Sequence, residues 1–416
     1  MRALLKSKET SGVEVNIAVT GSKSESNRLL LLKALYSNIA IENLSNSDDT
    51  VVLKQALETS SHTVDIHHAG TAMRFLTAYF ASTEGVDVIL SGSKRMHERP
   101  IKILVDALKD LGANIEYIDV DGYPPLRIYG SELKGDLVKM QANVSSQYIS
   151  ALLLIAPSLP KGLVLELEGA ITSIPYINMT LALLNQLDVT TSFEQNTIHI
   201  SPKQVVKDTR IVVESDWSSA SYFYSLIALS EESKVTLTSY SEESLQGDAA
   251  LINIYKALGI DTVFNASETA ITLSKTGEKI SNFLSLNLSN TPDIAQTIVV
   301  TCFGLGVGCK LTGLHTLKIK ETDRLSALKT ELEKLGAVVS ITKDSLELDA
   351  NRDTTFSGAI NEICEIDTYQ DHRMAMAFAP LALKFPLIIK DPMVVTKSFP
   401  SFWEDVESMG IAVDFK

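Results

Sequence analysis

The feature that most constrains the fold is an internal repeat of about 75 residues. Helical apolar patterns that end in Leu-Gly or a close variant run into alternating, strand-like patterns, as in "VDALKDLGANIEYI" and "LKTELEKLGAVVSI". The intervals between successive markers are 76, 71, 77 and 74 residues, the markers being Leu111, Leu187, Leu258, Leu335 and Met409. The segment "VVLKQALETSSHTVDI" supplies a weaker sixth copy near the N-terminus.

A second series of helical patterns lies out of phase with the first. These helices are apolar nearly all round, which predicts that they are buried, and each follows a capping or small polar residue. The steps are 75, 73, 74 and 79 residues, counted over Thr71, Ser146, Ser219, Asp293 and His372. The chain therefore reads as six copies of one α/β unit, each with a buried helix, a surface helix and several strands, and six units divide most simply into two domains of three.

Composition restricts the class of ligand. The 416 residues are 45% hydrophobic and carry a net charge of −14, which indicates a globular protein with ample core and argues against a nucleic-acid or anionic-membrane surface. An anion site must then be built from locally concentrated cations, and its ligand should be small. The three cysteines lack metal-ligand spacing, so we expect reduced thiols, a cytoplasmic location and no metal. The N-terminus lacks a signal-peptide pattern, and prolines interrupt the most apolar stretch, "ISALLLIAPSLPKGLVLEL", so no membrane role is expected.

Cationic residues gather in short motifs, several of them at or just before the starts of the predicted buried helices. Free N–H groups and the helix dipole favour anions there. The motifs are "GSKSESNR" with Lys23 and Arg28, "GSKRMHERP" with Arg95 and Arg99, "KIKETDRL" with Lys320 and Arg324, "QDHRMAMAF" with Arg373, and "VVTKSFPSFW" with Lys397. Lys320 and Arg324, four residues apart, are expected on one helix face. Any single motif is more often a solvated surface, but together they predict a site for a strongly anionic ligand.

Carboxylates within the same motifs are candidates for acid–base chemistry. Asp293 opens a predicted buried helix and Glu321 follows Lys320, although a helix N-terminal charge and a surface carboxylate are the simpler alternatives. For Asp48 and Asp49 in "SNSDDT" we favour a capping role. The adjacent histidines of "HHAG" have no third ligand nearby, so they do not indicate a metal site.

These motifs, together with "AGTAMRF", "VSSQY", "SIPYI" and "TPDIA", closely resemble in order the motif series of the 5-enolpyruvylshikimate-3-phosphate synthase family, over residues 21 to 402. The resemblance implies transfer of the enolpyruvyl group of phosphoenolpyruvate to the 5-hydroxyl of shikimate 3-phosphate, without a cofactor. It implies an α/β fold of two similar domains, each with three βαβαββ units around buried helices, an inside-out α/β barrel. We place these domains at residues 1–21 with 214–416 and at 22–213, with a hinge near 20–22 and 213–216 that closes on the substrates. A monomer is expected, with no partner besides the small-molecule substrates.

The resemblance also implies roles for individual residues. The shikimate 3-phosphate site would comprise Lys23, Ser24, Arg28, Ser145, Ser146, Gln147, Ser173, Tyr176, Asp293 and Lys320. The phosphoenolpyruvate site, which glyphosate occupies in this family, would comprise Lys23, Gly70, Arg99, Gln147, Arg324, Arg373 and Lys397. Asp293 would accept the 5-hydroxyl proton, and Glu321 with Lys23 would handle the proton at C3 of phosphoenolpyruvate.

The chain departs from the common family pattern at three positions. His68 replaces an asparagine, Phe75 a frequent proline and Thr316 an asparagine, which puts ligand contacts through His68 and Thr316 in doubt. Two alternatives stay open. One is the related transferase that acts on UDP-N-acetylglucosamine, which commonly carries a cysteine in a mobile loop. The other is a degenerate, non-catalytic copy of the fold, which would be marked by loss of Asp293, Glu321 or a cation.

Overall fold

The computed structural model describes residues 1–8, 12–141, 145–169, 171–350 and 363–416, with only the backbone at 319. The chain divides into two compact units, which are Met1–Thr20 with Glu214–Lys416 (unit 1) and Gly21–Val213 (unit 2). The chain passes between them at 20–21 and 213–214, within the segments where the sequence analysis places the hinge. That these segments act as a hinge stays a prediction.

Each four-stranded sheet in the described residues follows one topology. β16 (Phe283–Asn287) pairs in parallel with β17 (Gly308–Thr312), which pairs antiparallel with β19 (Leu346–Leu348), which in turn pairs with β18 (Val339–Ile341). Helices follow the first and second strands, so the chain order is βαβαββ and the spatial order is 1-2-4-3. In one sheet of unit 1 the fourth place in this order is taken by the N-terminal strand, residues 2–7, which comes first in the chain. The predicted unit and α/β class are confirmed.

The N-terminal residues complete two sheets of unit 1. β1 (Arg2–Ser7) lies antiparallel between β21 (Leu387–Lys390) and β22 (Ile411–Phe415), and β2 (Glu14–Ile17) pairs in parallel with β13 (Lys234–Thr238). Unit 1 is therefore interrupted in sequence by the whole of unit 2. Its remaining strands are β14 (Ile260–Asn265), β15 (Ala270–Lys275) and β20 (Cys364–Ile366).

Unit 2 repeats the pattern twice in full and once in shortened form. Its full sheets have the orders β4-β5-β7-β6 and β10-β11-β9-β8. Their strands are β4 (Thr63–Asp65), β5 (Asp87–Ser91), β6 (Asn114–Tyr117), β7 (Leu126–Tyr129), β8 (Leu137–Gln141), β9 (Leu163–Glu168), β10 (Thr191–Glu194) and β11 (Thr197–Ile200). The third sheet is the parallel pair β12 (Thr209–Val212) and β3 (Ile39–Glu42). In this shortened repeat only residues 59–62 separate the second helix, α2 (Asp48–Glu58), from β4, which leaves no room for a hairpin. The missing hairpin explains why the sixth copy is weak in the sequence.

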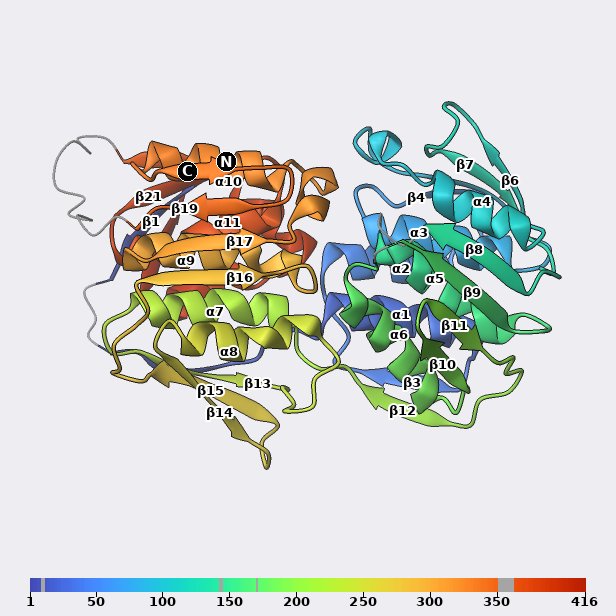
Figure 1. Cartoon of the computed structure of the whole chain (residues 1–416), viewed down its shortest axis with the longest axis horizontal. Coiled ribbons are helices and arrows are strands. Elements are labelled where there is room, and N and C mark those ends of the chain that lie inside the picture. Colours follow the sequence, from blue (N-terminus) through green and yellow to red (C-terminus); the bar gives the residue numbers. More distant parts are fainter. Residues whose placement is uncertain (9–11, 142–144, 170, 351–362) are drawn as a thin grey trace. The chain divides into compact units, whose positions relative to one another are not determined.

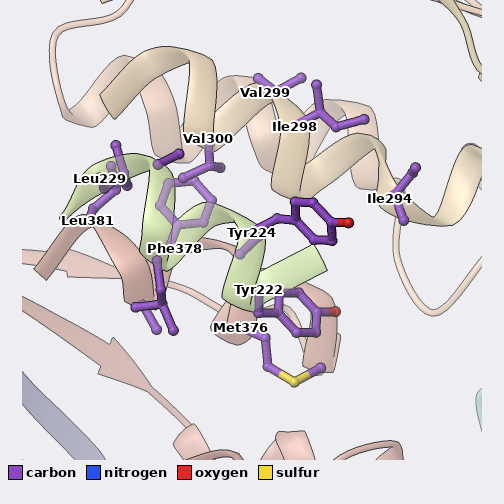
Figure 2. Packing of buried hydrophobic residues seen from close by; sticks show 14 of the residues in the cluster. Tyr222, Tyr224, Leu229, Ile294, Ile298, Val299, Val300, Met376, Phe378 and Leu381 are labelled. Atoms are coloured by element: carbon purple, nitrogen blue, oxygen red, sulfur yellow. The ribbon is translucent and has the colours of Figure 1, made fainter. Parts of the chain in front are cut away.

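Helices that are apolar all round form the interior of each unit. In unit 1, α7 (Trp217–Leu229), α9 (Ala295–Leu305) and α11 (His372–Phe378) contact one another, as Figures 1 and 2 show. In unit 2 the corresponding helices are α1 (Lys23–Leu35), α3 (Gly70–Ala81) and α5 (Ser146–Ile155). Every residue of α11 is buried, and so are all residues of α7 except Ser218. The second predicted helix series is thus the buried one.

The first helix series lies outside the buried helices. These helices are α2 (Asp48–Glu58), α4 (Lys102–Asp110), α6 (Ile174–Gln186), α8 (Leu251–Lys256), α10 (Arg324–Lys334) and α12 (Phe402–Ser408). Several end as the Leu-Gly pattern predicts. Leu111 and Leu335 are the C-caps of α4 and α10, and the glycines after them have φ of 104° and 86°. Glycine is favoured there because other residues rarely adopt this left-handed conformation.

No helix in the described part of the chain is both long enough and apolar enough to span a membrane.

Candidate functional site

Arg324 lies at the centre of the polar cluster of unit 1. Its side chain is buried, and its guanidinium donates to three carboxylates: Nε to Asp371 Oδ2 at 2.7 Å, Nη1 to Asp293 Oδ1 at 2.9 Å and Nη2 to Glu321 Oε2 at 2.8 Å. Burial alone would lower the pKa of Arg324, but the charges of these carboxylates raise it above its ordinary value. Arg324 therefore stays charged and fixes the positions of both predicted acid–base residues.

Three helix starts bring these carboxylates together. Asp293 lies in the 3-10 turn η4 (Pro292–Ile294) that leads into α9, and Asp371 is the N-cap of α11, where it accepts the N–H of Arg373 at 2.9 Å. Asp323 caps α10 by accepting the N–H of Ser326. The helix starts supply free N–H groups and positive dipole ends beside the cluster.

Two further predicted cations contact Asp293. Lys320 Nζ lies 3.5 Å from Asp293 Oδ1, and Arg373 Nη2 lies 3.6 Å from Asp293 Oδ2. The prediction that Lys320 and Arg324 share a helix face is wrong, because Asp323 starts α10 at Arg324 and leaves Lys320 in the preceding bend. The two cations meet at Asp293 instead.

Lys397 joins this cluster through the backbone. It ends the 3-10 segment η7 (Pro392–Lys397), and its Nζ donates to the carbonyl oxygen of Gln370 at 2.7 Å. The contact places the predicted cation one residue from Asp371.

Sequence reasoning missed three members of the cluster in unit 1. Asp371 preceded a predicted buried helix, a capping signal that could have identified it. Asp248 and Ser218 gave no comparable signal, because their partnership spans 30 residues: Ser218 Oγ donates to Asp248 Oδ2 and accepts from Arg373 Nη2 at 3.4 Å. Burial, together with the charge of Asp293, raises the pKa of Asp248 to about 7.

In unit 2, Arg28 is buried between neutral oxygen atoms. Nε donates to Thr180 Oγ1 at 2.8 Å, Nη2 to Ser150 Oγ at 2.8 Å, and Nη1 to the carbonyl oxygen of Ser24 at 2.8 Å. Nη2 also donates to the carbonyl oxygen of Tyr176 at 3.3 Å. Predicted residues Ser24, Arg28 and Tyr176 are thus brought together, while Ser150 and Thr180 were missed.

Arg28 has no carboxylate within 4.0 Å among the described residues of its unit. Its guanidinium carbon lies 5.6 Å from the ring centroid of Phe75, which is fully buried. Burial lowers the pKa of Arg28 to about 10, although Tyr176 and Glu25 oppose that shift. A buried cation surrounded by neutral groups is suited to an anion supplied by a ligand.

The starts of α5 and α6 carry the remaining hydroxyl and amide groups predicted for unit 2. Ser145 is the N-cap of α5, and Gln147 Nε2 donates to Thr71 Oγ1 at 3.1 Å. Ser146 lies four residues before Ser150, so it shares a helix face with an Arg28 partner. Ser173 is the buried N-cap residue of α6, with a φ of 55°.

Lys23 lies in the first turn of α1, with its Nζ 3.4 Å from Asp49 Oδ2. Asp48 and Asp49 lie in the first turn of α2, as a role at the helix start requires, but the N-cap itself is Ser47, which accepts the N–H of Thr50. Asp49 also pairs with Lys23, a predicted catalytic cation.

Gly70 and Arg99 are in direct contact at the start of α3. A Cβ placed on Gly70 would lie 2.4 Å from Arg99 Nη1 and 2.9 Å from Arg99 Cζ. The absence of a side chain at Gly70 therefore creates the space that the guanidinium occupies. Of the positions that depart from the family pattern, Thr316 has a buried Oγ1 without a hydrogen-bond partner among the described residues.

Comparisons with known proteins agree over nearly the whole chain. A profile of the EPSP synthase family, described as 3-phosphoshikimate 1-carboxyvinyltransferase, matches residues 50–406. Relatives with that enzyme name include a protein of Bacteroides fragilis strain YCH46, 45% identical over 99% of both chains, and one of Mannheimia haemolytica, 34% identical over 96% of this chain and 98% of its own. The solved structure of EPSP synthase from Acinetobacter baumannii superposes with a TM-score of 0.77 at 21% identity, covering 100% of both chains, which supports the fold.

Proposed function

The chain belongs to the EPSP synthase (3-phosphoshikimate 1-carboxyvinyltransferase) family, and from that premise we propose how its side chains divide the reaction. The chain transfers the enolpyruvyl group of phosphoenolpyruvate to the 5-hydroxyl of shikimate 3-phosphate, giving 5-enolpyruvylshikimate 3-phosphate and phosphate in aromatic amino acid biosynthesis. The assignment of residues to substrates and to proton transfers is the proposal.

Shikimate 3-phosphate is held chiefly by unit 2 in this proposal. Among the described residues Arg28 has no carboxylate within 4.0 Å, and its hydrogen-bond partners Ser150 and Tyr176 lie on α5 and α6. The starts of these two helices carry Ser145, Ser146, Gln147 and Ser173. Hydroxyl, amide and guanidinium donors at helix starts suit a phosphate ester and the oxygens of a hydroxylated ring. Lys23 and Ser24, at the start of α1, complete this set together with Lys320 and Asp293 from unit 1.

Phosphoenolpyruvate carries a carboxylate and a phosphate on adjacent positions of a three-carbon unit, and it needs several cations. Arg324, Arg373 and Lys397 in unit 1 are linked through Asp293 or the segment 370–373. In unit 2, Arg99 lies against Gly70, and Gln147 donates to Thr71, the next residue of α3. Lys23 lies in the first turn of α1. Arginine binds both anionic groups bidentately, which favours it over lysine for orientation.

The chemistry proceeds by addition and then elimination. Asp293 accepts the 5-hydroxyl proton as that oxygen bonds to C2 of phosphoenolpyruvate, and a proton delivered by Glu321 or Lys23 enters C3. C3 then returns a proton as the bond between C2 and the phosphate oxygen breaks with its electron pair. Arg324 orients both carboxylates, and the cations stabilise an intermediate that bears carboxylate and phosphate on one carbon.

The observation that carries the proposal is the joint contact of Arg324 with Asp293 and Glu321. Asp293→Asn tests it. Binding of shikimate 3-phosphate should stay within a few-fold of the parent, while turnover measured by phosphate release falls by about 10²-fold or more. Turnover within a few-fold of the parent would require a different base.

The acceptor is tested in the same assay. The parent enzyme is given phosphoenolpyruvate with either shikimate 3-phosphate or UDP-N-acetylglucosamine, and phosphate release is expected only with the first. We further propose that the enzyme acts as a monomer in the cytoplasm, a reducing compartment that suits its three free cysteines. Light scattering coupled to size-exclusion chromatography should give the mass of one chain, 45.4 kDa.

A further inference from the structure

The segment from Tyr369 to Arg373 connects three of the cations assigned to phosphoenolpyruvate. Lys397 donates to the carbonyl oxygen of Gln370, Arg324 donates to the carboxylate of Asp371, and Arg373 belongs to the segment itself. Asp371 also accepts the N–H of Arg373 and so starts α11. Any shift of this segment therefore moves several substrate-binding groups together.

The backbone of this segment has an uncommon conformation. Tyr369 and Gln370 both have positive φ, at 53° and 57°. Residues other than glycine rarely adopt this left-handed region, and two in succession persist only where surrounding contacts hold them. The contacts that fix the turn are thus candidates for control of the substrate-binding groups that follow it.

Glu331 supplies two of those contacts from the interior. Its side chain is fully buried, Oε1 accepts the hydroxyl of Tyr369 at 2.6 Å, and Oε2 accepts the N–H of Asp367 at 3.1 Å. Lys334 Nζ, 2.7 Å from Oε2, balances the charge. Burial, aided by the hydrogen bond to Glu331, raises the pKa of Tyr369 to about 12, so the hydroxyl keeps its proton and donates at neutral pH.

Glu331 and Arg324 are carried by the same helix, α10, seven residues and about two turns apart. One end of α10 therefore binds Asp371 through Arg324, and the next two turns bind Tyr369 and Asp367 through Glu331. A turn attached to one helix at two points cannot rotate about either contact alone. This geometry ties the orientation of Asp371 to the hydrogen bond of Tyr369.

We propose that Glu331 and Tyr369 are a positioning pair for phosphoenolpyruvate: they hold the left-handed turn that sets Asp371, and through it Arg324, Arg373 and Lys397. Neither residue belongs to the substrate-binding set proposed above. The inference rests on the residue roles under the proposed function and adds the requirement that a hydrogen bond behind the cluster controls phosphoenolpyruvate use.

Tyr369→Phe removes the hydroxyl and keeps the ring, and residue 369 is 38% exposed, so the variant should fold. We expect kcat/KM for phosphoenolpyruvate to fall about 10-fold, because small misplacements of binding groups lower rates strongly. KM for shikimate 3-phosphate, whose proposed ligands lie mostly in unit 2, should stay within about 2-fold. Glu331→Gln keeps an acceptor and should show a weaker form of the same pattern.

Tyr224→Phe is the matched control. Its hydroxyl makes one hydrogen bond, 2.7 Å to Thr262 Oγ1, in the same unit and without a contact to the 369–373 segment among the described hydrogen bonds. It should change Tm but neither KM value. A purely structural role for Tyr369 would make the two variants behave alike, and that result would overturn the proposal.

A double variant separates this inference from the residue roles on which it depends. In an Asp371→Asn background, where the turn no longer anchors Arg324 ionically, Tyr369→Phe should lower kcat/KM for phosphoenolpyruvate by less than about 2-fold. An Asp371→Asn variant with parent-like kinetics would refute the role of Arg324 and Asp371. An impaired Asp371→Asn variant together with a parent-like Tyr369→Phe variant would refute only the positioning pair.

Discussion

At the scale of single residues, Gly70 shows how an absent side chain shapes the site. The family resemblance places Gly70 in the phosphoenolpyruvate site, which glyphosate occupies in this family. The structure places the guanidinium of Arg99 where a methyl group on Gly70 would lie, with 2.4 Å between the built Cβ and Nη1. The first effect of a larger residue therefore passes through Arg99.

Gly70→Ala should accordingly displace Arg99 and weaken the binding of both phosphoenolpyruvate and glyphosate. We expect KM for phosphoenolpyruvate to rise about 10-fold, since one bidentate cation moves, with KM for shikimate 3-phosphate nearly unchanged. The inhibition constant for glyphosate, measured against phosphoenolpyruvate, should rise as well. Addition of Gly70→Ala to Arg99→Ala should have little further effect, and full additivity would show that the methyl acts elsewhere.

Asp248 provides a second prediction at this scale, concerning pH. Its folded-state pKa of about 7 lies above its ordinary value of 3.8, chiefly because the carboxyl is buried. The neutral form is therefore favoured in the fold, and the associated stability is present below pH 4 and is lost as the pH rises to about 7. Above pH 7 the fold contains an ionised, buried carboxylate.

Asp248→Asn mimics the neutral form of the carboxyl group. The free energy of unfolding of this variant, relative to that of the parent, should therefore rise between pH 4 and pH 8. Each unit of pKa shift corresponds to about 1.4 kcal/mol, and we expect a change of roughly 2–4 kcal/mol in the difference between the two free energies of unfolding. Urea denaturation of both proteins across this range measures it. Other carboxyl groups titrate in both proteins, so their effects cancel in the difference between the two free energies of unfolding. A difference that stays constant with pH would contradict the raised pKa of Asp248.

At the scale of elements, the buried helices of unit 1 approach closely at Gly304 of α9. A Cβ there would lie 2.7 Å from Leu229 Cδ2 of α7 and 2.9 Å from Leu381 Cδ2 of η6 (Ala379–Leu383). Figure 2 shows Leu229 and Leu381 side by side near α9. Gly304 therefore sets the distance between these elements.

Gly304→Ala should destabilise unit 1 by about 1 kcal/mol. Overpacking costs about 1–3 kcal/mol in a dense core, while alanine gains up to about 1 kcal/mol over glycine in helix propensity, so the clash prevails. Thermal unfolding should show a lower Tm with unchanged KM values. Leu381→Ala opens space, and in that background Gly304→Ala should be neutral or stabilising; equal destabilisation in both backgrounds would exclude the clash.

At the scale of the whole molecule, the proposed ligands of each substrate are divided between two units that the chain connects twice. If one substrate engages residues of both units, binding should reduce the radius of gyration. Small-angle scattering with and without shikimate 3-phosphate tests this prediction of closure. An unchanged radius in a form shown to be open without ligand would refute it.

Much of this protein was determined by the sequence alone. The repeat, the two helix series and the left-handed glycines after Leu111 and Leu335 follow from local physics, because apolar periodicity and backbone conformation depend on residues close in the chain. The family motifs likewise named Arg324, Asp293 and Glu321. Partners distant in sequence required the tertiary structure. Arg324 meets Asp371 across 47 residues, Ser218 meets Asp248 across 30, and Glu331 meets Tyr369 across 38. No local pattern encodes these pairs, since each forms only when separate helix starts and turns are packed together. The same packing brings Lys320 and Arg324 together at Asp293, rather than on one helix face as expected.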